Sequence, residues 1–126
     1  MYPSDRKYSK EHEWVKLDGD AATIGITQFA QEQLGDIVYV EAPSVGTTVK
    51  AGDVLGTIES VKAVSEIYAP VGGEVVEVNG TLDGAPETVN GDPHGDGWYC
   101  RIRVADAAEV DALMDASAYE ELASSS

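Results

Sequence analysis

The chain has 126 residues, 43% of them hydrophobic and 7% aromatic, which suits one domain with a core of Val, Ile, Leu and Ala. The net charge of −15 argues against binding to nucleic acid or to anionic membrane surfaces, because both require basic patches. No apolar run approaches the roughly 20 residues of a membrane helix, and the polar N-terminus lacks the apolar centre of a signal peptide. We therefore expect a cytoplasmic protein.

The first half of the chain contains three local patterns. Gly19 tolerates a positive φ and lies in the turn Asp-Gly-Asp between two β-rich runs. Thr27 is a suitable helix cap and Gly35 a suitable stop. The patterns predict a hairpin over Val15–Leu17 and Ala21–Ile26, a helix over Thr27–Gly35 and a strand over Ile37–Glu41.

A short repeat follows these elements. The segment "APSVGTTV", from Ala42, matches "APVGGEVV", from Ala69, at an offset of 27 residues. The second copy carries an insertion, "DGAPETVNGDPHGDG", after which "WYCRIRV" resembles the earlier strand "VLGTIES". Two strand–turn–strand units, each with one apolar face, would bury those faces against each other. The repeat predicts two similar β layers related by a pseudo-twofold axis.

The two copies join at "SVKA", which contains Lys62, one of five lysines. This tetrapeptide has no Asn-Gly or Asp-Gly, so turn propensity does not predict a tight turn there. The repeat does predict one, and it places Lys62 at an exposed tip. A lysine at such a tip is usually a solvated charge. The alternative is a modified lysine, because acylating the ε-amine removes the charge and installs a long arm.

The C-terminal segment, residues 106–123, is predicted to be helical, beside a core of about residues 8–105 in a single domain spanning 1–126. An apolar stripe at helical spacing supports this prediction. Two capping boxes are possible, one from Asp106 with Glu109 and one from Ser117 with Glu120. The last three residues, 124–126, are expected to be disordered.

The sequence gives little support for metal binding or catalysis. The loop "DPHGDG" resembles a calcium loop, but His94 and Arg103 stand where oxygen ligands are needed, so we expect no metal. Cys100 lies in a strand pattern and is expected to be an inert packed thiol. Trp14 is expected in the core with its N–H on a partner. We predict no catalytic residues.

The segment "ESVKAVSEIYAPVGGEVVEVN" resembles the lipoylation segment of glycine cleavage system H proteins. The resemblance extends from "YSKEHEWVKL" through "IGITQFAQEQLGDIVYVEAPSVGTTVKAGD" to "VNGDPHGDGWYCRIRV" and the final helix. It implies a mainly β fold, a flattened barrel or barrel-sandwich hybrid with short peripheral helices. The departures are His94 where the family usually has Tyr, and Thr88 where Leu is common; both lie in the insertion.

The resemblance also implies a function. Lys62 would carry lipoate in amide linkage, and Glu59, Ser60, Val61 and Ala63 would guide its attachment by a lipoate-attaching enzyme. The arm would take an aminomethyl group from glycine decarboxylase to a tetrahydrofolate-dependent aminomethyltransferase, and electrons to dihydrolipoamide dehydrogenase. Glu13 and Glu66 would line a cleft that shields the loaded arm. The protein would be a monomeric carrier and not an enzyme.

Three competing carrier interpretations differ in their support, and a fourth, an enzyme with Cys100 as nucleophile, would require a thiolate with a lowered pKa. A biotin carrier shares the hairpin-lysine architecture, but biotin acceptor lysines resemble Met-Lys-Met, and the neighbours here are Val61 and Ala63. A lipoyl domain of a 2-oxoacid dehydrogenase lacks the "HEW" opening and the helical C-terminus. A stand-alone lipoate relay, or a lipoyl carrier for another complex, would have the same acceptor motif.

Overall fold

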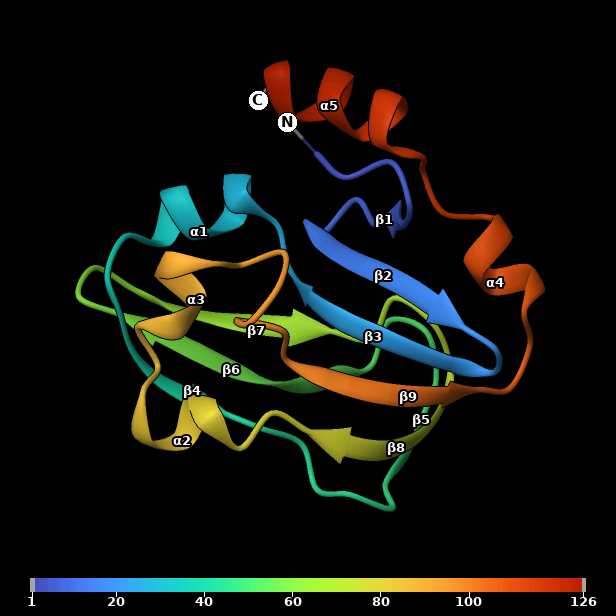
Figure 1. Cartoon of the computed structure of the whole chain (residues 1–126), viewed down its shortest axis with the longest axis horizontal. Helices are drawn as coiled ribbons and strands as arrows, with labels where there is room; N and C mark the ends of the chain where they lie inside the picture. Colours follow the sequence, from blue (N-terminus) through green and yellow to red (C-terminus); the bar gives the residue numbers. More distant parts are fainter. Residues whose placement is uncertain (1, 126) are drawn as a thin grey trace.

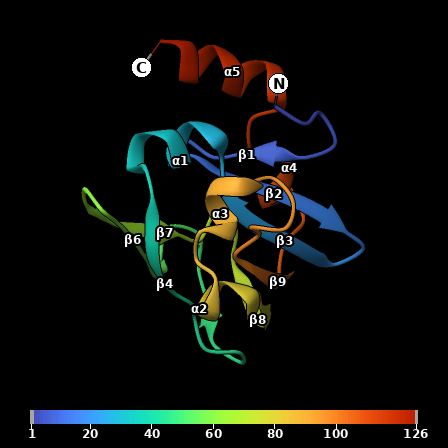
Figure 2. The same cartoon turned by 60° about the vertical axis from the view of Figure 1, so that its left-hand side comes forward.

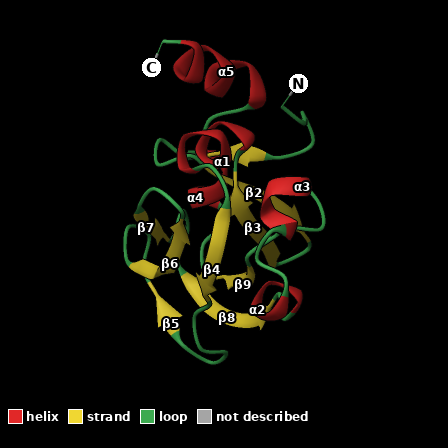
Figure 3. Ribbon diagram, turned by 90° about the vertical axis from the view of Figure 1, so that its left-hand side faces the viewer, coloured by secondary structure: helices red, strands yellow, loops and turns green. Residues whose placement is uncertain are grey.

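A computed structural model describes residues 2–125 of the chain (Figure 1). Its strands form two sheets, one ordered β1-β2-β3-β9-β8-β5 and one ordered β4-β6-β7, with helices at the periphery (Figures 1 and 3). The mainly β fold with short helices and a C-terminal helix is confirmed, although the sheets do not close into a barrel. The strands are β1 (Lys7–Tyr8), β2 (Glu13–Asp18), β3 (Ala21–Ile26), β4 (Ile37–Glu41), β5 (Thr48–Val49), β6 (Val54–Ser60), β7 (Val64–Tyr68), β8 (Gly73–Val78) and β9 (Cys100–Val104). The helices are α1 (Gln28–Leu34), α2 (Thr81–Gly84), α3 (Thr88–Gly91), α4 (Ala108–Asp111) and α5 (Ala116–Ser124).

The core fills the space between the two sheets. In β9 and in the first half of β8, buried residues alternate with more exposed ones, as the period of two requires, and the core residues of the two sheets are mostly aliphatic. A second, aromatic cluster forms where α5 packs against β1 and β2, and it contains Tyr8, Trp14 and Tyr119. The main core includes Val15, Ile24, Ile58, Ile67, Val75 and Ile102.

None of the helices in residues 2–125 has the length and apolar character needed to cross a bilayer.

The local predictions for the first half are confirmed. The β2–β3 hairpin turns at Gly19, whose φ is +65°. Thr27 caps α1 by accepting a hydrogen bond from the Ala30 N–H, and Gly35 ends the helix with a φ of +79°. The strand β4 has the predicted bounds. Each of these patterns is satisfied by groups close in sequence, which is why the sequence reveals them.

The repeat is present, but the predicted layers are wrong. β4 and β7 lie 27 residues apart, as the offset requires. However, the smaller sheet takes β4 and β6 from the first copy and β7 from the second, while the larger sheet pairs β5 of the first copy with β8 of the second. Because the β6–β7 hairpin at the junction keeps β7 beside β6, each sheet combines strands of both copies.

The C-terminal segment departs from its predicted capping. Asp115 caps α5 by accepting from the Ala118 N–H, so the box at Ser117 is wrong. At α4, Asp106 accepts from the Ala108 N–H, but Glu109 accepts from the Gly72 N–H instead of closing a box. The helical segment is interrupted between α4 and α5, and α5 continues through residue 124, against the predicted disorder. Residue 126 lies outside the described residues.

Candidate functional site

Lys62 lies at the tip of the β6–β7 hairpin and is exposed. Figure 2 shows this hairpin projecting from the body beside α1. The Ser60 hydroxyl oxygen accepts hydrogen bonds from the backbone N–H groups of Lys62 and Ala63, each at 3.1 Å. The Ser60 N–H in turn donates to the Ala63 carbonyl at 2.8 Å. A serine side chain therefore makes the turn that Gly or Asn chemistry would otherwise supply.

The tip is also anchored to the segment between α1 and β4. The Val61 N–H donates to the Asp36 carbonyl at 3.0 Å. The side-chain amide of Asn90, from α3, accepts from the Ile37 N–H and donates to the Gly35 carbonyl. A β-carbon at Gly35 would come within 3.2 Å of Lys62 Cε, so glycine there gives the lysine stem room. The hairpin thus presents Lys62 from a fixed turn, with its stem beside the end of α1.

A cavity of about 170 Å³ lies between α1 and the two sheets. It brings Glu13 and Glu66 together, as the resemblance implied. With seven residues, α1 is about 10 Å long. The end of α1 lies beside the lysine stem, and four of its residues, at both ends of the helix, line the cavity. The cavity walls are Glu11, His12, Glu13, Ile26, Phe29, Ala30, Gln33, Leu34, Ile58, Ser65, Glu66 and Ile67.

Glu13 is an unusual carboxylate because it is only 2% exposed. It accepts hydrogen bonds from the Ser9 hydroxyl at 2.5 Å and from the Tyr68 N–H at 3.2 Å. Burial raises the pKa of this carboxyl to about 7, against the lowering effect of these two bonds. No Lys or Arg of residues 2–125 forms an ion pair with it. Ionising a buried carboxylate that has no cation beside it costs free energy.

Glu66 differs from Glu13 in its surroundings. It is exposed at the mouth of the cavity, where its carboxylate accepts a hydrogen bond from the Tyr68 hydroxyl at 3.2 Å. Solvent therefore already stabilises its charge, and Glu66 can contribute at most a peripheral attraction for a cation in the cavity. The two carboxylates that the resemblance paired are thus unequal.

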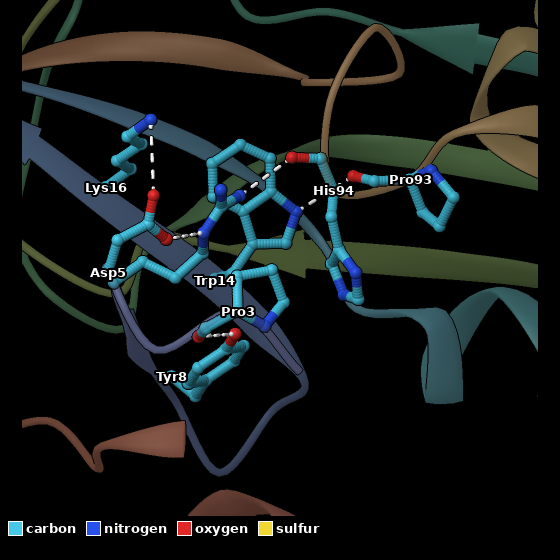
Figure 4. Close-up of polar contacts among 8 residues, drawn as sticks. Pro3, Asp5, Tyr8, Trp14, Lys16, Pro93 and His94 are labelled. Carbon is cyan, nitrogen blue, oxygen red and sulfur yellow. Dashed lines mark hydrogen bonds and ion pairs between the residues drawn. The ribbon is translucent and has the colours of Figure 1, made fainter. Parts of the chain in front are cut away.

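Trp14 is buried as predicted, and the insertion supplies its partner. Its indole N–H donates to the Pro93 carbonyl at 2.9 Å (Figure 4). The Arg6 guanidinium lies over its ring, 4.6 Å from the centroid. Arg6 also donates to the His94 carbonyl at 2.7 Å. The loop that resembles a calcium site therefore fastens β2, the strand that begins at Glu13.

Cys100 lies in β9 and is fully buried, as predicted. Burial raises the pKa of its thiol to about 12. A thiol in that state carries almost no thiolate near neutral pH, so a nucleophilic role has no support.

Comparison with known proteins decides the family. A family model described as "Glycine cleavage H-protein" matches residues 6–126. The chain belongs to this H-protein family. The H protein of Phenylobacterium zucineum is 62% identical over 114 residues, covering 90% of this chain and 94% of that relative. The H protein of Enterobacter sp. (strain 638) is 59% identical over 121 residues, covering 95% and 94%. A crystal structure of the H protein from Mycobacterium marinum matches with a TM-score of 0.88 at 40% identity, covering 95% and 97%.

Membership of the H-protein family gives the chain its role. H proteins are lipoyl carriers of the glycine cleavage system, and this chain is accordingly a non-catalytic carrier subunit. The family resemblance singled out Lys62, Glu13 and Glu66, and the structure places the two carboxylates at one cavity; the resemblance did not single out His12 and Phe29 in the cavity wall. A tilted ring contact joins these two side chains, with centroids 4.7 Å apart. Their separation in sequence left no local pattern to reveal it.

Proposed function

We propose that Lys62 carries the lipoyl group in amide linkage. The exposed ε-amine at the tip of an ordered turn is the observation that supports this assignment, because an attaching enzyme can reach it without unfolding the chain. The lipoyl group, when bound, supplies a dithiolane that accepts an aminomethyl group and two electrons. The chain's own residues present the arm, shelter its end and exclude water.

Four neighbours of Lys62 are proposed to guide attachment, each in a different way. Ser60 shapes the turn through its hydroxyl, and Val61 anchors the turn through its N–H. Ala63 closes the turn through both backbone groups and leaves the lysine unobstructed. Glu59 lies at the end of β6, opposite Tyr39 on β4 and Val64 on β7. There it offers an attaching enzyme a negative charge beside the acceptor.

Glu13 is proposed to hold the cationic amine of the loaded arm. An ionised Glu13 inside the cavity would form a charge-assisted hydrogen bond with that amine, stronger than a neutral one because of its charge and little screened because Glu13 is buried. The aliphatic and aromatic walls supplied by α1 would keep water from the arm. Glu66 would attract the amine at the entrance.

The partners follow from the same proposal. They are glycine decarboxylase, the tetrahydrofolate-dependent aminomethyltransferase, dihydrolipoamide dehydrogenase and a lipoate-attaching enzyme. The monomeric state, the cytoplasmic location and the single-domain boundaries stay predictions.

Lipoate ligase is expected to add one lipoyl group to the protein, at Lys62. Intact-mass measurement followed by peptide mapping checks this. Lys62→Arg keeps the charge and should abolish the addition. Addition at Lys50 or Lys16, or an unchanged mass with an active ligase, would refute the assignment. Turnover with the three partner enzymes then distinguishes glycine cleavage from a stand-alone lipoate relay.

Replacing Glu13 with alanine should speed loss of the aminomethyl group from the loaded arm by about tenfold or more. The expected loss of one charge-assisted hydrogen bond, about 1.5–3 kcal/mol, sets this factor. Ammonia release from the loaded protein, followed over time, measures it. Glu11→Ala is the matched control, since Glu11 lines the same cavity but is exposed. Equal decay in wild type and Glu13→Ala would remove the sheltering role.

A further inference from the structure

The C-terminal helix α5 contributes one buried hydroxyl to the far side of the cavity wall. Tyr119 is fully buried and stacks on Tyr8 of β1, with ring centroids 4.9 Å apart. Its hydroxyl oxygen lies 2.8 Å from His12 Nδ1 and 2.7 Å from Thr27 Oγ1. Figures 2 and 3 show α5 lying beyond α1, at one end of the molecule. One hydroxyl therefore joins the loop before β2 to the start of α1.

Both partners of Tyr119 shape the cavity. His12 lines it, directly precedes Glu13, and has a φ of +68°, a conformation that is strained for a residue other than glycine. Thr27 caps α1 by accepting from Ala30, whose side chain also lines the cavity. The Thr27 N–H donates to the His12 carbonyl at 3.0 Å. The strained loop and the helix start are thus held against each other.

The three side chains form one connected chain of hydrogen bonds, whichever atom donates at Tyr119. In one assignment the Ala30 N–H donates to Thr27 Oγ1, the threonine hydroxyl donates to Tyr119, and the tyrosine hydroxyl donates to Nδ1 of a neutral His12 ring. In this arrangement every hydrogen is used, and the chain runs from α1 through α5 to the loop that carries Glu13. A phenylalanine at 119 would fill the same space and break the chain in its middle.

We propose that Tyr119 is a positioning residue for the arm cavity: its hydroxyl fixes His12, and hence Glu13, relative to α1. This inference rests on the proposed role of the cavity in sheltering the arm on Lys62. It also gives α5 a function, since the helix makes no part of the cavity lining itself. The helix acts through one hydroxyl on a wall built by residues about 90 and 107 positions earlier.

Tyr119→Phe tests the proposal, with Tyr8→Phe as its matched control. Tyr8 lies in the same aromatic stack and is equally buried, but its hydroxyl donates to the Pro3 carbonyl, away from the cavity. In the unmodified protein, Tyr119→Phe should speed amide exchange at Thr27 and Ala30 about fivefold, the factor for one neutral hydrogen bond. In the loaded protein it should speed aminomethyl loss by a similar factor. Tyr8→Phe should change neither rate.

The outcomes separate this inference from the function on which it rests. Wild-type exchange at both amides in Tyr119→Phe would overturn the positioning role, as would equal acceleration by Tyr8→Phe, which would indicate general loosening. Faster exchange without faster aminomethyl loss would overturn the link to the arm, provided that Glu13→Ala does speed the loss. If Glu13→Ala also leaves the loss unchanged, the sheltering function itself fails, and the amide exchange still decides whether Tyr119 positions the wall.

Discussion

Replacing Glu13 with glutamine should make the protein progressively more stable, relative to wild type, as the pH rises from 4.5 to 8. Burial raises the pKa of Glu13 from 4.5 to about 7. Between these two pH values the folded state holds a proton on Glu13 that the unfolded state has released. The free energy of unfolding of the wild type therefore falls as the pH rises from 4.5, and the loss is complete once the pH has passed through 7. The full shift corresponds to about 3 kcal/mol. Glutamine does not titrate and escapes this loss.

Urea unfolding of both proteins at pH 5, 6, 7 and 8 measures the difference. Glu11→Gln is the control, because this neighbouring acid is exposed and should shift the free energy of unfolding by a small and nearly constant amount. A constant difference between wild type and Glu13→Gln across this range would mean that Glu13 titrates normally. The raised pKa of Glu13 would then no longer support the proposal that the cavity binds a cation.

Replacing Gly56 with alanine should destabilise the fold by about 3 kcal/mol or more. Gly56 lies in β6, opposite Ile67 of β7, where the Tyr99 hydroxyl crosses to donate to the Glu41 carbonyl at 2.5 Å. A β-carbon at Gly56 would collide with both the Tyr99 hydroxyl and the Glu41 carbonyl. The backbone of β4 would have to move away from β6, at the cost of overpacking and of the buried hydrogen bond.

Thermal unfolding checks this prediction, with an expected fall in Tm of about 10 °C or more. Gly80→Ala is the control, since nothing lies within 4 Å of the β-carbon that it would add. A fall in Tm no larger than that of Gly80→Ala would show that β4 and β6 yield easily at this point. The anchoring of the lysine hairpin through β6 would then need another explanation.

The sequence predicted those parts of the fold that neighbouring residues determine. The hairpin at Gly19, the capped helix α1 and the strand β4 each carry their own start and stop signals. The exposed lysine turn was predicted from the repeat, although the turn itself uses the Ser60 hydroxyl, which no standard turn pattern shows. Lys62 as an acceptor and the pairing of two carboxylates came from the family resemblance.

What the sequence did not predict depends on contacts between distant segments. One example is that β5 and β7 each pair with strands of the other repeat copy. The hydrophobic period along a single strand does not show which strand will be its neighbour in the sheet. The burial of Glu13 involves a distant segment, since its carboxylate accepts a hydrogen bond from the Tyr68 N–H of β7. The link from Tyr119 to His12 spans most of the chain, so only the folded structure shows it.

The anchored turn makes the presentation of Lys62 depend on the completed fold. The hairpin tip is held by the Asp36 carbonyl, and the segment that provides this carbonyl is held by Asn90 of the insertion. A nascent chain that has not yet formed α3 contains the same four residues around Lys62 but lacks the full set of restraints. Under the proposed role of Lys62, an attaching enzyme that recognises the shape of the turn would modify completed molecules in preference to partly folded ones.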